Sequence, residues 1–204
     1  MKIHYKAAQL ALYGIGVNVH IATVGGKNRI SVFDSRAIMV LNWEDPFNRD
    51  SKFSIDVNRT DVVHMLRRGK PTNGYYDLRI HEDKRQCFFY DHAVLTDTDD
   101  PKKALIGNTF YTEVDANQFN PYFAGLSVDQ SIMTGSVSLD FDRLRYVLEF
   151  LHNYVTAGRF GNENLRIINF QSVNEEFPLV IQAFMKLDEL IIGDLDVAVF
   201  SFKK

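Results

Sequence analysis

The chain of 204 residues has a single cysteine, Cys87, few prolines and no long uninterrupted hydrophobic run. One cysteine excludes an internal disulfide and any zinc site built from several cysteines, and it fits a reducing compartment. No stretch is long and apolar enough to span a membrane. The opening residues do not form a signal peptide, because Gln9, Asn18 and His20 interrupt their apolar run. We therefore expect a cytoplasmic protein.

Positive charge is not in excess either. The chain has 23 Lys and Arg against 26 Asp and Glu, which gives a net charge of −3. A nucleic-acid partner therefore cannot be inferred from overall charge, and only a local basic surface would support one. Aromatic residues, by contrast, make up 13% of the chain, a content that suits sheets and interfaces.

Sequence motifs of catalysis and metal binding are also lacking. No G-x-S-x-G or P-loop occurs, and "GIG" at 14–16 lacks the third glycine of a dinucleotide fingerprint. "HEDKR" at 81–85 lacks the second histidine of a zinc-protease motif. His81 and His92 fall on adjacent predicted strands and could approach each other, although two such histidines are far more often structural. We predict no metal, no cofactor and no enzymatic activity.

The first half of the sequence does contain clear strand and helix patterns. Apolar spacing predicts a helix over 5–13, and "GGKN" at 25–28 is a hairpin-turn signal. Alternation over 53–57 predicts a strand. At Asn58, a good N-cap, the period changes to that of a helix over 58–69. Further strands are predicted at 29–33, 36–43, 75–83 and 85–95.

The second half begins at a candidate linker, residues 96–109, which combines an acidic run with a proline and a glycine. A short strand over 110–115 follows, and then a short helix or loop that Pro121 interrupts. A second strong helix starts near Asp142, which we expect to cap it as Asn58 caps the first. Strands are predicted at 165–171, 177–184 and 196–202.

The two halves of the sequence predict the same order of elements. Residues 54–59, "SIDVNR", align with 138–143, "SLDFDR", and "LRI" recurs at 78–80 and 165–167. Each half then has a strand, a helix, a polar turn and two strands. We interpret this as an internal duplication, against the alternative that any α+β protein contains two such units.

Two units of this kind resemble the domains of DNA sliding clamps, the ring-shaped processivity factors of polymerases. "YKAAQLALYGIG" resembles the opening helix of a clamp domain, and "FSIDVNRTDVVHMLRRGK" resembles its strand and second helix. The likeness implies an α+β fold of two tandem domains, at 1–98 and 99–204, each with antiparallel sheets and two helices. Residues 108–136 depart from the pattern, so the second domain is expected to be shorter or rearranged.

The resemblance also implies a function. Such rings contain six domains, so a two-domain chain would form a homotrimer around double-stranded DNA. It would tether a DNA polymerase without sequence specificity, and a clamp loader would be a further partner. The compact size suggests a viral or phage protein, acting in the host cytoplasm or nucleoid.

Candidate binding residues follow from the same likeness and from charge. The solvent face of the helix at 58–69 is basic, as a surface facing DNA phosphates would be, although an ordinary solvated helix end has the same appearance. The predicted DNA-binding residues are Lys2, Lys6, Arg59, His64, Arg67, Arg68, Lys70, Arg143, Arg145 and Arg159. By position alone, the predicted partner-binding residues are Val94, Leu95, Leu105, Ile106 and Phe200.

Two other functions stay open at this stage. The alternative hypothesis is a β-rich structural or interaction protein, such as a virion, host-interaction or clamp-mimic protein, with no direct DNA role. That hypothesis predicts one dominant exposed apolar patch. An enzyme with dispersed site residues is the third, and it predicts a deep pocket with converging titratable groups.

Overall fold

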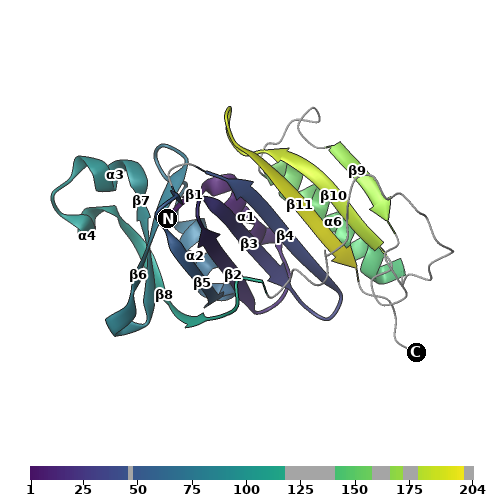
Figure 1. The fold of residues 1–204 in the computed structure, drawn as a ribbon, viewed down its shortest axis with the longest axis horizontal. Helices are drawn as coiled ribbons and strands as arrows, with labels where there is room; N and C mark the ends of the chain where they lie inside the picture. The colour runs from purple at the N-terminus through teal and green to yellow at the C-terminus, as the bar shows by residue number, and fades with distance from the viewer. Residues whose placement is uncertain (46–47, 118–140, 158–165, 172–178, 200–204) are drawn as a thin grey trace.

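The computed structural model describes residues 1–45, 48–117, 141–157, 166–171 and 179–199 (Figure 1). Its central feature is a sheet of 11 antiparallel strands in the order β1-β6-β7-β8-β5-β2-β3-β4-β11-β10-β9. The strands are β1 (Lys2–His4), β2 (Asn18–Val24), β3 (Lys27–Phe33), β4 (Ala37–Glu44), β5 (Lys52–Asn58), β6 (Tyr75–His81), β7 (Gln86–Asp91), β8 (Leu105–Glu113), β9 (Arg166–Gln171), β10 (Leu179–Lys186) and β11 (Ile192–Val199).

Three longer helices stand in a row behind this sheet in the view of Figure 1. They are α1 (Tyr5–Tyr13), α2 (Arg59–Arg68) and α6 (Phe141–Ala157). Helix α1 contacts both of the others. Two short helices, α3 (His92–Asp97) and α4 (Pro101–Ala104), lie at the far end beside β7 and β8. The antiparallel sheet and the helices match the predicted α+β class.

The local signals read from the sequence place the first half correctly. The β2–β3 hairpin turns at Gly25 and Gly26, which both have positive φ, as a tight hairpin turn requires. The Asn58 side chain accepts a hydrogen bond from the Thr60 amide at 2.8 Å, so Asn58 is the N-cap of α2. Asp142 differs from the expectation, because it lies inside the first turn of α6 and not at the cap. Its negative charge interacts favourably there with the helix dipole.

The core lies between the helices and the sheet. The buried residues of α1 are mostly alanines, namely Ala7, Ala8 and Ala11, with Leu10, and such small side chains let this central helix lie close to the strands. From α6, Tyr154 is fully buried and donates a hydrogen bond to the Lys6 carbonyl at 2.9 Å. This contact ties the second half of the chain to the first.

The predicted linker is the main error in the element assignment. Two helices occupy much of this segment instead of a loop. Asp91, just before it, caps α3 by accepting the amides of Ala93 and Val94, and Asp100, within it, caps α4 by accepting that of Lys102. Strand β7 therefore ends at Asp91 and not at 95. Residues 105–109 are the first part of β8, which pairs with β7 and then with β5.

Part of the repeated order is present among the described residues. Helix α2 is followed by the antiparallel meander β6–β7–β8, and helix α6 by the antiparallel meander β9–β10–β11. The two meanders flank β5-β2-β3-β4 in mirrored order, because β8 joins β5 and β11 joins β4. The strand expected just before α6 and most of the segment around Pro121 lie outside the described residues.

Candidate nucleic-acid interface and partner pocket

The solvent face of α2 carries the predicted cations. His64, Arg67 and Arg68 are exposed, and Lys70 follows the helix and is exposed too. An Arg68 nitrogen donates to the Ile106 carbonyl at 3.3 Å, while Lys70 Nζ lies 4.1 Å from the centre of the Tyr5 ring. The acid on this helix, Asp61, is turned toward β8 by a 2.7 Å hydrogen bond from Thr109 Oγ1. The exposed end of α2 is therefore basic.

Arg59 has a different place from the one predicted. Its Nε donates to the Ala11 carbonyl at 2.8 Å, and a terminal nitrogen donates to the Leu12 carbonyl at 3.2 Å. These are carbonyls of the last turn of α1, which have no partner within the helix. Arg59 thus caps α1 and is half-buried, so its charge serves the packing of α1 on α2.

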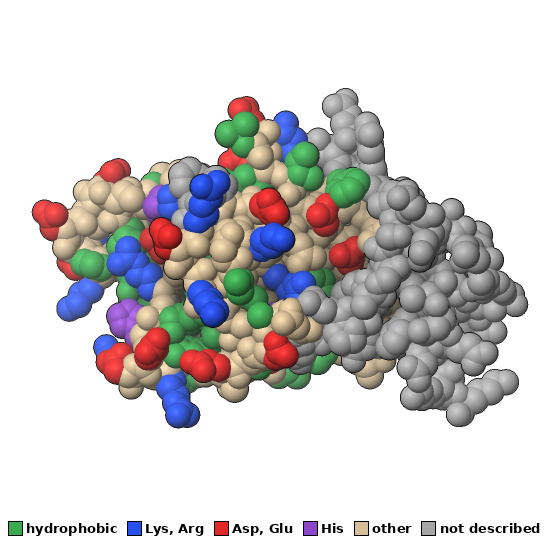
Figure 2. Space-filling view, in the orientation of Figure 1, with side chains coloured by type: hydrophobic (Ala, Val, Ile, Leu, Met, Phe, Trp, Pro, Cys, Tyr) green, Lys and Arg blue, Asp and Glu red, His purple; other side chains and the backbone are tan. Residues whose placement is uncertain are grey.

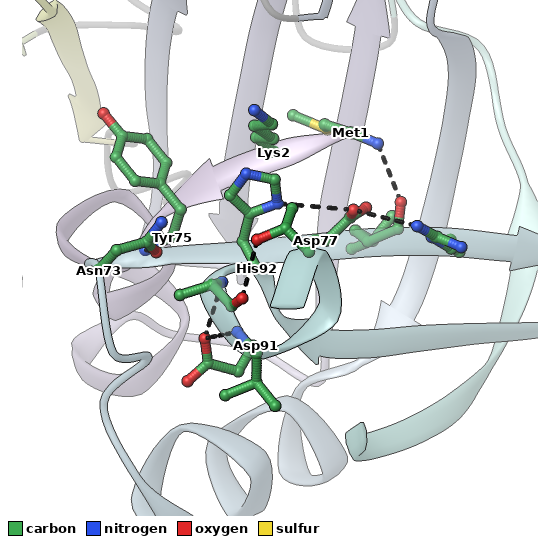
Figure 3. Close-up of polar contacts among 12 residues, drawn as sticks. Met1, Lys2, Asn73, Tyr75, Asp77, Asp91 and His92 are labelled. Carbon is green, nitrogen blue, oxygen red and sulfur yellow. Dashed lines mark hydrogen bonds and ion pairs between the residues drawn. The ribbon is translucent and has the colours of Figure 1, made fainter. Parts of the chain in front are cut away.

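Lys2 does not join the α2 cluster either. It lies opposite Asp77 in the β1–β6 pair, on the face of the strand away from Ile3 and the core. In Figure 3, its side chain stands beside the ring of His92, which in turn points toward Asp77. Burial lowers the pKa of His92, and the charge of Lys2 lowers it further. Lys2 therefore belongs to the opposite face of the sheet from α2.

The α1 and α6 surfaces contribute less charge than α2. Lys6 is half-buried and its Nζ donates to the Lys186 carbonyl at 3.5 Å. On α6, Arg145 forms an exposed ion pair with Glu149 at 2.8 Å, one helical turn on. Arg143 is half-buried, and Arg159 lies outside the described residues. The basic surface is thus concentrated at α2.

A cavity of about 470 Å³ is lined both by predicted DNA-binding residues and by predicted partner-binding residues. Arg68 and Lys70 line it together with Val94, Leu105 and Ile106, and Lys103 adds a third cation. Leu95 is half-buried nearby in α3, and Phe200 lies outside the described residues.

The acid of this cavity, Asp91, is already fully engaged. The Thr72 amide and hydroxyl both donate to it at 2.8 Å, and the Ala93 and Val94 amides donate as well (Figure 3). Burial alone would raise the pKa of Asp91, but these hydrogen bonds outweigh it and lower the pKa. The carboxylate therefore holds α3 in place, and its negative charge offsets part of the charge of the neighbouring cations.

A larger groove of about 810 Å³ lies where β4 meets β11, and the sequence did not predict it. Its apolar rim includes Val24, Leu190 and Ile192, of which Leu190 is 95% exposed. Arg29 crosses its floor, donating to Asn42 at 2.8 Å and to the Ala116 carbonyl at 3.0 Å. The one sequence signal was the apolar run at 190–192, which is unusual in a hairpin turn.

The same hairpin turn is anchored to the first half of the chain. The Tyr75 hydroxyl donates to Asp188 at 2.5 Å. Burial and the Asp188 carboxylate raise the pKa of Tyr75, and the hydrogen bond from Tyr75 lowers that of Asp188. Nearby, burial lowers the pKa of His4 to about 4. The rim of the groove is therefore held at a defined place relative to β6 and α1.

One polar cluster has the residue types of a hydrolase triad. His20 Nδ1 lies 3.1 Å from Asp56, and its Nε2 lies 3.5 Å from Ser54 Oγ. His20 is fully buried, and it faces Asp56 directly in the β2–β5 register. The serine contact is at the outer limit of a hydrogen bond, so we interpret the cluster as a cross-strand polar pair. His81 and His92, in contrast, lie at opposite ends of the β6–β7 hairpin.

Two general findings concern the described part of the chain. No group of three His, Cys, Asp or Glu side chains is placed there to hold a metal ion. Among the helices in the same residues, none has the length and apolar character needed to cross a membrane.

Comparison with known proteins gives a likeness of structure only. No protein-family model matches the chain, and no curated protein matches it. Solved structures that resemble it include the β subunit from DNA polymerase of Streptococcus pyogenes, with 12% identity and a TM-score of 0.43. A second is the DNA polymerase III β chain of Streptococcus pneumoniae TIGR4, with 9% identity and a TM-score of 0.41. A third is a putative DNA polymerase III β subunit from Eubacterium rectale ATCC 33656, with 8% identity and a TM-score of 0.46.

Each likeness covers 100% of this chain but only 50%, 49% and 51% of the other chain, so this chain spans about half the length of those structures. With identities this low and TM-scores under 0.5, they assign neither a function nor a partner to it.

Proposed function

We propose that this chain is a sliding-clamp-like processivity factor, which encircles double-stranded DNA and tethers a polymerase without catalysing a reaction. The observation that carries the proposal is the arrangement of the described elements. A helix followed by a three-stranded meander occurs at each end of one sheet, in mirrored order, and α2, α1 and α6 lie on the same face. Such a repeat supplies a continuous wall with helices on one side.

In this proposal, DNA lies along the helix face. The exposed cations Arg67, Arg68 and Lys70 approach phosphates, with smaller contributions from Lys6, Arg143 and Arg145. Each neutralised phosphate releases counterions and makes binding depend on salt. A few such contacts give weak binding without sequence preference, which suits a protein that moves along DNA. Arg59 and Lys2 are left out of this set, because one caps α1 and the other lies on the opposite face.

The two-domain organisation is part of the same proposal. We place the end of the first domain after β8 and not at residue 98, because β8 completes the sheet with β7 and β5. Three chains would then form a closed ring of six domains, opened by a clamp loader. A viral or phage source and action in the host cytoplasm remain part of the proposal.

The groove at the β4–β11 junction is the proposed site for a polymerase peptide. Its exposed apolar rim, Leu190 and Ile192, offers burial to an apolar side chain, and Lys27 and Arg29 line the same groove. The residues predicted by position, Val94, Leu95, Leu105 and Ile106, form a second candidate at the far end. An interaction protein without a DNA role would use the same groove, so only a DNA experiment separates the two functions.

The test is retention on linear duplex DNA whose ends are blocked after loading. A ring stays on blocked DNA and slides off free ends, and a protein that binds only by charge is lost from both at high salt. We expect the double variant Arg67→Glu, Arg68→Glu to leave much less protein on the blocked DNA, because the reversed charges repel the phosphates while the ring is being loaded. The matched control is Arg49→Glu, Lys52→Glu, which changes the charge equally at two exposed sites away from α2. Equal retention by both double variants would refute the helix-face assignment.

A further inference from the structure

The outer face of β6, β7 and β8 carries an aromatic cluster that the proposed function does not use. In the strand register, Arg79 lies opposite Phe88 and Phe88 opposite Asn108, while His81 lies opposite Gln86 and Gln86 opposite Phe110. Residues directly opposite each other point to the same face of a sheet. We call this surface the aromatic face, made of Arg79, His81, Gln86, Phe88, Tyr90, Asn108 and Phe110.

This surface is unusual because the other side of the same strands already faces the core. Leu78, Cys87 and Phe89 are buried there. A sheet with one solvated face normally alternates apolar and polar residues, so the outward positions should be polar. Instead Phe88 and His81 are half-buried and Phe110 is 68% exposed. One exposed ring beside two half-buried rings on a solvated sheet face indicates a binding surface.

The side chains of the aromatic face are arranged around Phe88. Its ring centre lies 4.6 Å from that of His81 and 6.3 Å from that of Tyr90, with the Phe88 and Tyr90 planes only 16° apart. The Arg79 guanidinium lies 5.7 Å from the centre of the Tyr90 ring and is held by Asp77 at 3.5 Å. Tyr90 itself is buried, at 8% exposed, and supports Phe88 and Arg79. The flat groups that reach solvent on this surface are therefore His81, Phe88, Phe110 and the Arg79 guanidinium.

The aromatic face is accessible in the described structure. Figure 2 shows hydrophobic side chains beside a histidine and Lys or Arg side chains at the β6–β8 end of the molecule. Gln86 and Asn108 add amide groups between the rings. The charges around the hairpin turn are mixed, since Lys84 and Arg85 stand next to Glu82 and Asp83. A ligand here must gain more from stacking than from charge.

We propose that the aromatic face binds single-stranded DNA through base stacking. Bases stack on exposed aromatic rings and on Arg guanidinium groups with little sequence preference, and sheets that present aromatic residues on neighbouring strands are one known platform for this. Three strands about 4.8 Å apart offer room for about two or three bases. The choice of DNA as the ligand rests on the proposed function, which brings a template strand to the molecule. The presence of the stacking surface does not depend on that function.

The test measures fluorescence anisotropy of a labelled 12-nucleotide oligo-dT with the full chain. We expect binding in the micromolar range, and we expect Phe110→Leu and Phe88→Leu each to weaken it by about tenfold, which corresponds to the loss of about 1.4 kcal/mol of stacking. The matched control is Phe184→Leu, which removes another exposed strand phenylalanine, 45% exposed on β10; it should bind like the wild type. Because only about one or two phosphates are contacted, the logarithmic salt slope should stay near −1.

Several results would overturn this inference. The first is that the wild type does not bind oligo-dT. The second is that Phe110→Leu binds oligo-dT as tightly as the wild type, and the third is that Phe110→Leu and Phe184→Leu lose the same affinity. Tighter binding of oligo-rU would refute the choice of DNA. A change of solution mass in Phe110→Leu without oligonucleotide binding would show that this face joins copies of the chain. Failure of the duplex-retention test leaves this result untouched, because Arg67→Glu, Arg68→Glu should bind oligo-dT like the wild type.

Discussion

Removal of the Tyr154 side chain should test whether α6 is anchored on α1. Tyr154 is fully buried, its ring lies 5.7 Å from that of Phe150, and its hydroxyl donates to the Lys6 carbonyl at 2.9 Å. Deleting only the hydroxyl, in Tyr154→Phe, removes one hydrogen bond and should cost about 1 kcal/mol. Deleting the ring, in Tyr154→Ala, also leaves a cavity and should cost about 3–5 kcal/mol.

The assay is urea denaturation followed by circular dichroism at pH 7. The matched control is His152→Ala on the same helix, where the side chain is exposed and the free energy of unfolding should change by less than about 0.5 kcal/mol. If Tyr154→Ala were as stable as His152→Ala, α6 would not pack on α1. The row of helices that supports the proposed function would then be wrong.

Three further predictions concern stability. Burial lowers the pKa of His4 to about 4 from its ordinary 6.5, so between these pH values the unfolded chain binds a proton that the folded chain does not. Stability should therefore fall as pH drops from 6.5 toward 4, and His4→Asn should lose less stability than the wild type between pH 7 and 5 in the same assay. Gly16→Ala should cost more than about 1 kcal/mol, because φ is +83° and a Cβ would lie 1.9 Å from the Phe33 carbonyl oxygen. Asn58→Ala should cost about 1 kcal/mol by removing the cap on Thr60, measured by urea midpoint.

Each has its own contradicting outcome. The control for His4 is His64→Asn, at an exposed histidine; equal acid sensitivity in both variants and the wild type would show that His4 does not set the profile. A Gly16→Ala protein as stable as the wild type would place that backbone in another conformation. For α2, Asn58→Asp should retain stability, because a carboxylate caps equally well, and a loss equal to that of Asn58→Ala would contradict the cap.

Local chemistry explains why much of the fold was predictable. Gly25 and Gly26 permit one kind of turn, and Asn58 marks a change from a two-residue to a helical period, so the elements from residue 5 to 81 follow from short-range rules. The segment around Asp100 was misjudged because acidic residues fit both linkers and helix caps. Only the neighbouring amides, which the side chains of Asp91 and Asp100 accept, separate the two.

The candidate sites depend on contacts that no local rule gives. Arg59 sits on the helix like Arg67, yet its guanidinium reaches carbonyls 47 and 48 positions earlier in the chain. The groove joins the β2–β3 turn to the β10–β11 turn, which meet only because β4 pairs with β11. The aromatic face needs the register of three strands, and a shift of one residue would turn Phe88 into the core.

The solution mass across a concentration series tests the proposed ring most directly. Light scattering should give a species at three times the 23.5 kDa mass of one chain as concentration rises, and this species should be the form retained on end-blocked DNA. A mass of one chain at every concentration would contradict an autonomous ring, and the β4–β11 groove would then belong to an interaction protein without a DNA-encircling role.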